Sequence, residues 1–351
     1  MDRMSDVFDP DAPAPAESGV YGLPHTPEQA RVILIPVPWD ATTSYRAGAA
    51  RGPDAIRRAS RQVDLFDIET GRPYAAGIHM LTEEESVVRL AAQAREAAEP
   101  VIEAGGMSPG GSHELARATE EVNQLGDELN RWLRAETERW LDQRKLVGIV
   151  GGDHSVPFAA IEALAERHPG LGILHVDAHA DLRAAYEGFT WSHASIMYNV
   201  ATRIPAVGRI VQVGVRDVGA AEERMSRESA GRIVTHYEPN LAALRFGGES
   251  WADQCARIVA PLPHEVWISF DIDGLDPAYC PHTGTPVPGG LSFAQATHLL
   301  RVLGESGRKI VGFDLSEVAP GSSEPDSADD WDGNVGARLL YKMIGWALRQ
   351  H

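Results

Sequence analysis

Cysteine, long apolar runs and positive charge are all scarce in this sequence of 351 residues. Its two cysteines, Cys255 and Cys280, are too few for a disulfide scaffold in a chain of this length, and they indicate a reducing compartment. No run of about 18 apolar residues occurs, so we expect no membrane-spanning helix. The N-terminal segment has no apolar signal core. These absences together favour a cytoplasmic protein.

The shortage of positive charge is the strongest bias in composition. Lys and Arg number 32 against 50 Asp and Glu, which gives a formal net charge of −18. So acidic a surface argues against nucleic acid or an anionic membrane as the main partner. It is compatible with a small cationic ligand, although solubility accounts for most of the acid excess.

The order of apolar segments predicts an α/β fold. Residues 1–20 are rich in Pro, Asp and Ala without periodicity, and we expect a flexible arm there. Residues 21–351 read as one domain. Short apolar runs, the strand candidates, alternate with helical patterns in units of roughly 30 residues, which predicts three α-β-α layers around a mostly parallel central sheet. The runs are 31–38, 146–152, 171–179, 209–217, 265–273 and 309–318.

A helical insert is predicted at about 79–145. Thr82 and Glu85 form a capping-box pattern, and the helix that follows should bend or break at Pro100. A glycine-rich turn at 105–112 leads to a second helix, whose apolar positions repeat at intervals of three and four up to Trp140.

Polar residues cluster where the predicted strands end, the edge at which parallel sheets bind ligands. Alternate residues of an extended chain face the same way, so the Asp-x-His-x-Asp and Asp-x-Asp motifs should each project to one side. A lone Asp-x-Asp pair is often only a turn or a helix cap, but several such motifs after successive strands favour one shared site. The residues are Asp153 and His154, then Asp177, His179 and Asp181, then Asp271 and Asp273, and finally Glu317.

Four aspartates brought close together need a counter-charge to stay ionised. Two divalent cations would balance four carboxylates accompanied by two neutral imidazoles. This ligand set suits Mn²⁺ and leaves Ni²⁺, Co²⁺ and Fe²⁺ open, whereas a structural zinc site would use thiolates.

The motifs resemble those of the ureohydrolases, the arginase and agmatinase family, over about 31–350. The matching segments are GGDHS (151–155), DAHAD (177–181), SHAS (192–195), SFDIDGLDP (269–277), TGTPVPGG (283–290) and SEV (316–318). The resemblance implies an arginase-like fold and a binuclear centre, usually of Mn²⁺. One ion would take His154, Asp177, Asp181 and Asp271, and the other Asp177, His179, Asp271 and Asp273, with Asp177 and Asp271 bridging.

The resemblance also implies hydrolysis of a guanidino C–N bond, which releases urea and an amine. Paired metals would activate a water molecule for attack on the guanidinium carbon. Glu317 matches the glutamate that pairs with the guanidinium, and His193 the histidine that protonates the leaving amine. Positioning of substrate remains an alternative role for His193.

The loop 182–195 should select the substrate, and it looks like the agmatinase branch of the family. Tyr186 and Glu187 would meet the substrate tail, and Glu187 suits the amine of agmatine. Trp191 and His282 are bulky and would shorten the pocket, which would favour guanidine, methylguanidines or metformin-like biguanides, with nickel as an alternative metal. A formimidoylglutamase-type amidine hydrolase is a third reading, with Arg183 as the one candidate grip for a carboxylate.

Two other classes remain open from the sequence. The chain could be a non-catalytic partner subunit, which the complete ligand set argues against, or a single-zinc deacetylase, which would need fewer carboxylates. By resemblance we expect a homo-oligomer, a trimer or hexamer, with a hetero-oligomer containing a paralogue as the alternative.

Overall fold

The computed structural model describes residues 8–106, 112–321 and 330–349. Residues 1–7 of the expected arm and residues 107–111 of the expected turn lie outside this description. The described part opens with two turns and the short helix η1 (Val20–Gly22), whose Val20 and Tyr21 side chains are buried. Phe8 also packs against this core, so the chain contacts the domain ahead of residue 20.

The centre of the fold is one sheet of eight strands in the order β2-β1-β3-β8-β7-β4-β5-β6, and every pairing is parallel. This confirms the predicted parallel sheet. The two edge strands, β2 and β6, were not predicted, because each is short and lacks a strong apolar run. The strands are β1 (Val32–Val37), β2 (Ile78–Met80), β3 (Leu146–Gly151), β4 (Leu171–Val176), β5 (Val207–Val215), β6 (Ile233–Tyr237), β7 (Glu265–Asp271) and β8 (Lys309–Ser316).

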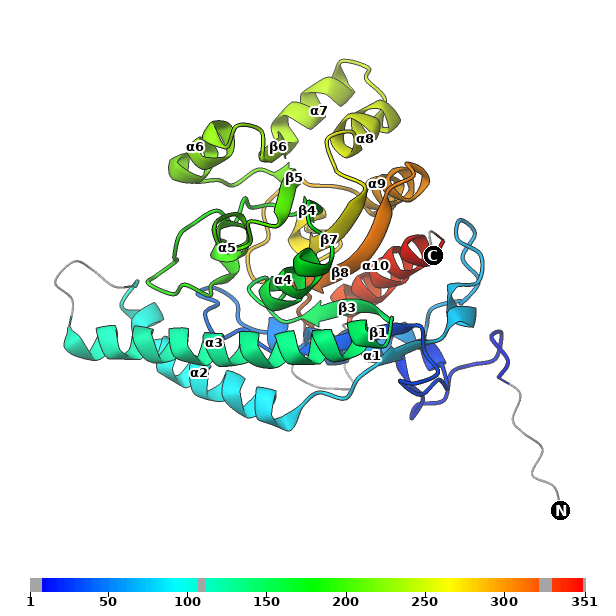
Figure 1. Ribbon diagram of the computed structural model, residues 1–351, viewed down its shortest axis with the longest axis horizontal. Helices are drawn as coiled ribbons and strands as arrows, with labels where there is room; N and C mark the ends of the chain where they lie inside the picture. The colour runs from blue at the N-terminus through cyan, green and yellow to red at the C-terminus, as the bar shows by residue number, and fades with distance from the viewer. Residues whose placement is uncertain (1–7, 107–111, 322–329, 350–351) are drawn as a thin grey trace.

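Alternation along the strands divides the core into two layers of side chains. In β1, Val32 and Leu34 face one layer while Ile33 and Ile35 face the other. The first layer packs against α1 (Gly52–Ser60), α8 (Trp251–Val259), α9 (Phe293–Glu305) and α10 (Trp331–Leu348). The second packs against α3 (His113–Asp142), α4 (Phe158–Arg167) and α5 (Ile196–Arg203). Figure 1 shows α4 and α5 on one side of the central strands and α9 and α10 on the other. Helix α6 (Ala220–Glu228) follows β5, and α7 (Glu238–Phe246) follows β6.

The predicted helical insert contains α2 (Glu85–Glu103) and α3, which lie side by side along the domain (Figure 1). One local prediction was wrong: Glu84, not Thr82, occupies the N-cap of α2. The helix continues past Pro100 to Glu103, so Pro100 does not break it, and a bend there stays a prediction. A small cluster joins Ala98, Val101 and Val122 of this pair to Phe189, so the helices support the predicted substrate loop.

Among the described residues, no helix combines the length and apolar character needed to cross a membrane. Cys255 and Cys280 are both buried and not disulfide-bonded.

Candidate metal centre

Four neighbouring strands, β3, β8, β7 and β4, end at the same edge of the sheet. His154 follows β3, Asp177 follows β4, Asp271 ends β7 and Glu317 follows β8. Because the sheet is parallel, these residues meet although they are far apart in sequence.

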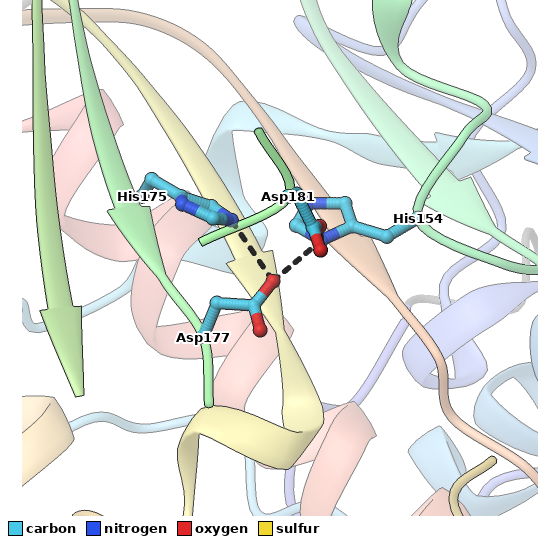
Figure 2. Close-up of side chains that lie close together, drawn as sticks. All are labelled: His154, His175, Asp177 and Asp181. Carbon is cyan, nitrogen blue, oxygen red and sulfur yellow. Dashed lines mark hydrogen bonds and ion pairs between the residues drawn. The ribbon is translucent and has the colours of Figure 1, made fainter. Parts of the chain in front are cut away.

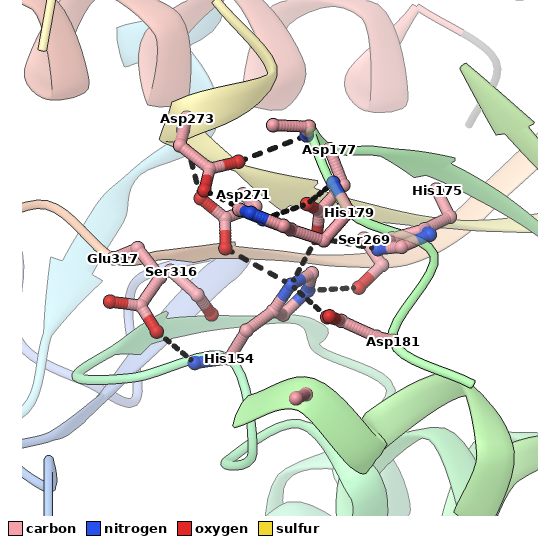
Figure 3. Close-up of polar contacts among 12 residues, drawn as sticks. His154, His175, Asp177, His179, Asp181, Ser269, Asp271, Asp273, Ser316 and Glu317 are labelled. Atoms are coloured by element: carbon pink, nitrogen blue, oxygen red, sulfur yellow. Dashed lines mark hydrogen bonds and ion pairs between the residues drawn. The ribbon is translucent and has the colours of Figure 1, made fainter. Parts of the chain in front are cut away.

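Two groups of donor atoms form there. In the first, His154 Nδ1 lies 3.0 Å from Asp177 Oδ2, 3.4 Å from Asp181 Oδ2 and 3.3 Å from Asp271 Oδ2 (Figures 2 and 3). In the second, His179 Nδ1 lies 3.4 Å from Asp177 Oδ1 and 3.1 Å from Asp273 Oδ2.

The two groups share Asp177, whose two carboxylate oxygens face different histidines. Its role as a bridge between two ions stays a prediction. For Asp271, Oδ2 faces His154 while Oδ1 accepts a hydrogen bond from the backbone N–H of Asp273, so its bridging role stays a prediction.

The local geometry differs from the extended chain assumed from the sequence. β4 ends at Val176, and the next residues turn: His179 N–H donates to Asp177 Oδ1 at 2.6 Å, and Asp181 has a positive φ of 53°. Asp273 likewise lies in the short helix η5 (Ile272–Gly274). The side chains therefore converge through tight turns capped by their own carboxylates, and not through strand alternation.

Electrostatics favours cations between these groups. Burial and the neighbouring Asp177 carboxylate raise the pKa of Asp181 well above its usual range, and burial together with Asp273 does the same for Asp271. Although burial lowers it, the carboxylates of Asp273 and Asp177 raise the pKa of His179 to about 12. The crowded carboxylates thus favour positive charge in the space that they share with the two imidazoles. Oxygen donors in this number, with one imidazole nitrogen on each side, fit a pair of divalent cations.

Four residues behind the donors were missed from the sequence. His175 Nε2 lies 2.9 Å from Asp177 Oδ2, and Gln212 Nε2 lies 3.0 Å from His175 Nδ1. On the other side, His154 Nε2 lies 2.9 Å from Ser269 Oγ, which also contacts Asp314. All four are buried in the interior of strands. A polar residue inside an otherwise apolar run was the available signal.

Glu317 is held close to the donors but outside both groups. Its Oε1 accepts a hydrogen bond from the backbone N–H of His154 at 3.0 Å (Figure 3), and its own backbone has a positive φ of 63°. Burial and the nearby Asp153 raise the pKa of Glu317 well above its usual range. Its carbonyl accepts from Thr283 Oγ1, which anchors the predicted TGTPVPGG segment to the site.

A cavity of about 170 Å³ opens beside the second donor group. It is lined by His179, Asp181, Arg183, Tyr186, His193, Ala194, Asp217, Glu222 and Thr285. The His193 ring lies edge-on to Tyr186 at 5.8 Å between centroids. Its Nδ1 is buried and has no hydrogen-bond partner in the described part of the chain. Burial and the charge on His179 lower the pKa of His193 to about 4.

The structure does not bring the other three predicted substrate residues to this cavity. Trp191 packs against Phe158 and lies over Gly126 of α3, and its Nε1 donates to Asp127 at 2.8 Å. His282 contacts Asp332 at the start of α10 through its backbone N–H and its Nδ1. Glu187 follows Tyr186 in the same turn with a positive φ of 54°, next to Gly106, and does not line the cavity.

The sequence model of the arginase family matches residues 30–345 of this chain. The chain belongs to the arginase family. This family membership agrees with the donor geometry, because the family uses a binuclear divalent metal centre, typically of manganese.

Relatives and solved structures within the family span the whole domain. The chain is 34% identical to N(1)-aminopropylagmatine ureohydrolase of Thermus thermophilus over 93% of this chain and 94% of that protein. It is 30% identical to guanidinobutyrase of Pseudomonas aeruginosa over 92% and 89%. The structure of proclavaminate amidino hydrolase from Streptomyces clavuligerus superposes with a TM-score of 0.72 at 26% identity, covering 97% of this chain and 100% of that one. The agmatine ureohydrolase of Thermoplasma volcanium has the same fold, with a TM-score of 0.70 at 23% identity over 95% and 94%. This arginase-family protein is accordingly placed among hydrolases.

Proposed function

We propose that this protein hydrolyses the guanidino C–N bond of an agmatine-type alkyl guanidine and releases urea and an amine. The observation that carries the proposal is the sharing of Asp177 by two donor groups beside a cavity that contains His193. The proposal agrees with the names of the relatives, which include ureohydrolases and a guanidinobutyrase.

The residues around the donors have complementary tasks in this reaction. The bound cations would supply an activated water molecule close to the guanidinium carbon. Glu317 Oε1 is committed to the His154 backbone, which leaves Oε2 to accept a hydrogen bond from the guanidinium. The positive charge of the guanidinium would favour the ionised form of this buried carboxyl group, and the ion pair would hold the planar cation in one orientation.

His193 would carry the proton. Its lowered pKa keeps the imidazole neutral at pH 7, so it would first accept a proton from the attacking water and then donate it to the leaving nitrogen. The electron pair of the broken C–N bond stays with that nitrogen, which leaves as the amine. The unpartnered Nδ1 of His193 is available for this transfer.

The cavity wall favours a cationic tail over a carboxylate tail. Arg183 Nε lies 3.5 Å from Glu222 Oε2, and its guanidinium stacks on Tyr186 at 5.2 Å, so the one candidate carboxylate grip is already engaged. Asp217 is exposed at the same wall. Together with Glu187 beyond the rim, it would attract the primary amine of agmatine. An amidine such as formimidoylglutamate is therefore the less favoured substrate.

A compact guanidine or biguanide is the second candidate, and the size of the cavity supports it. About 170 Å³ is small for a ligand pocket, since drug-sized ligands occupy roughly 300–1,000 Å³. Guanidine or methylguanidine would fill this space without a tail.

Mn²⁺ is the metal that we propose, because four carboxylates and two imidazoles form a predominantly hard donor set. Ni²⁺ is the alternative. A trimer or hexamer, or a hetero-oligomer with a paralogue, remains a prediction from the resemblance. A non-catalytic subunit is disfavoured because the full set of six donors is brought together.

The test is a substrate panel with urea detection, run on separate Mn²⁺- and Ni²⁺-loaded preparations. Agmatine, 4-guanidinobutyrate, guanidine, methylguanidine and metformin are the substrates. Urea from agmatine at the highest kcat/KM supports the leading proposal, and preference for guanidine supports the second. Release of no urea from any of them contradicts both.

A further inference from the structure

A second cavity, of about 330 Å³, lies at the opposite edge of the sheet, where β1, β3 and β8 begin. The lining residues are Arg31, Leu141, Arg144, Lys145, Leu146, Arg167, His168, Lys309 and Val311. Five of these nine residues are Lys or Arg, one is His and none is acidic. Such a lining is unusual in a chain with a net charge of −18, and the proposed hydrolysis makes no use of it.

The cations differ in how they are engaged. Lys145 Nζ donates to the carbonyls of Glu28 and Ala30, Arg167 pairs with Asp142, and His168 contacts Glu265. The side chains of Arg31, Arg144 and Lys309 make no hydrogen bond or ion pair with any described residue. Three positive charges therefore line one concavity without a hydrogen-bonded or ion-paired acid of their own among the residues that the structure describes.

Helix ends explain only part of this arrangement. Arg144 follows α3, and Arg167 ends α4, and cations are commonly favoured at helix C-termini by the helix dipole. The helix dipole does not explain Arg31 and Lys309, because they stand at the starts of strands. The five cations come from four separate segments of the chain, so only the tertiary fold gathers them.

We propose that this cavity binds a small anion that carries two or more phosphate groups, such as pyrophosphate or the phosphate chain of a nucleotide. Arginine presents a planar fork of N–H donors that matches phosphate oxygens, and lysine adds a mobile point charge. Two or three negative charges would balance the three unpartnered cations. The apolar floor formed by Leu141, Leu146 and Val311 limits the hydration of the bound anion and strengthens its attraction to the walls.

This site is separate from the metal centre. β3 and β8 each begin at the cationic cavity and end at the donors, and the shorter of them, β3, has six residues and spans about 20 Å. Pyrophosphate binding is thus independent of whether the guanidino hydrolysis is correct, and the two proposals fail separately.

The experiment is isothermal titration calorimetry of the metal-loaded protein with inorganic pyrophosphate at 0.15 M salt. We expect saturable binding of one anion per chain. Arg31→Gln and Lys309→Gln should each weaken binding about tenfold, because each removes one charge-assisted contact. Arg224→Gln is the matched control: it removes the same charge from an exposed position of α6 and should bind as the unmodified protein does.

Two further measurements identify the chemical class of the bound anion and test whether chelation of the metal causes the signal. Tighter binding of ATP than of pyrophosphate would point to a nucleotide as the ligand. Equal binding of the two would point to an inorganic polyphosphate, and either result supports the site. Metal content is measured after each titration, because pyrophosphate also chelates divalent ions. The proposal is overturned by the absence of saturable binding, by full affinity in the Arg31→Gln and Lys309→Gln double variant, or by heat that follows metal loss. Thermal unfolding of each variant shows that weakened binding is not a consequence of misfolding.

Discussion

The side-chain amide of Gln212 determines which nitrogen of His175 carries the proton. Gln212 Nε2 lies 2.6 Å from the carbonyl oxygen of Ala180 and 3.0 Å from His175 Nδ1. A carbonyl only accepts, so the atom that faces it is the amide nitrogen, and its second N–H points to His175 Nδ1. His175 Nδ1 must then accept, which leaves the proton on Nε2 for donation to Asp177 Oδ2. Gln212 therefore orients, through one histidine, the carboxylate shared by both donor groups.

Gln212→Glu should weaken metal binding about 10- to 100-fold, the usual effect of losing a partner of a metal ligand. The new carboxylate cannot donate to Ala180 or His175, and it adds negative charge behind Asp177. Calorimetric titration with Mn²⁺ measures the affinity. Gln254→Glu is the control, since Gln254 is also fully buried but lies in α8. Equal loss in both variants would mean that a buried acid, and not the orientation of Asp177, causes the effect.

Removal of single carboxylates should separate the two ions. Asp177→Asn should leave fewer than one ion per chain, because both donor groups use this residue. Asp181→Asn should lose only the ion near His154, and Asp273→Asn only the ion near His179. Elemental analysis of ions per chain after dialysis measures this. One retained ion in Asp177→Asn would contradict the sharing inferred from the geometry.

The tail of the substrate should be sensed by Asp217 in the cavity wall and by Glu187 beyond it. Glu187→Gln and Asp217→Asn are compared with agmatine and with guanidine as substrates. Neutralising an acid that binds the amine should raise KM for agmatine about tenfold, because a charge-assisted hydrogen bond is lost. KM for guanidine should stay unchanged. Equal changes for both substrates would remove that residue from tail recognition.

Trp191 should matter for stability and not for substrate choice. Its side chain is 8% exposed and packs between Phe158 and α3. Trp191→Ala should lower the free energy of unfolding by about 3–5 kcal/mol through the cavity it leaves, while the ratio of kcat/KM values for agmatine and guanidine stays constant. Chemical denaturation measures the stability, with Trp331→Ala at a 47% exposed position as control. A changed ratio would restore Trp191 to the pocket.

Stability should decline in mild acid because of His236. Burial and the Arg257 guanidinium lower the pKa of His236 from 6.5 to about 4. Between these pH values the unfolded chain binds a proton at His236 more readily than the folded chain does. The contribution of neutral His236 to the free energy of unfolding is therefore complete above pH 6.5 and is lost as the pH falls towards 4. The free energy of unfolding should fall less between pH 7 and pH 5 in the His236→Gln variant. After allowance for the partial exposure of the ring, the difference should be about 1–2 kcal/mol. Urea denaturation at both pH values measures it. The exposed His113→Gln variant should show no such difference.

Local patterns were sufficient for the parallel sheet and for the segments whose polar side chains meet at its edge. Buried strands require continuous apolar runs, and polar residues directly after such runs are conspicuous, so the segments that carry His154, Asp177 and Asp271 were recognisable without coordinates. The edge strands β2 and β6 were not, because a short strand at an edge needs little apolar sequence.

Only the tertiary structure decided which atoms meet. The division of the Asp177 oxygens between two histidines depends on the turn after β4, in which His179 N–H donates to Asp177 Oδ1. The contact of Gln212 with His175 joins neighbouring strands separated by a long stretch of sequence. Trp191 reads as a pocket residue from its place in the loop, yet α3 covers it, since packing depends on partners that sequence spacing does not reveal. The cationic cavity is assembled in the same way from distant segments, which is why a net charge of −18 concealed it.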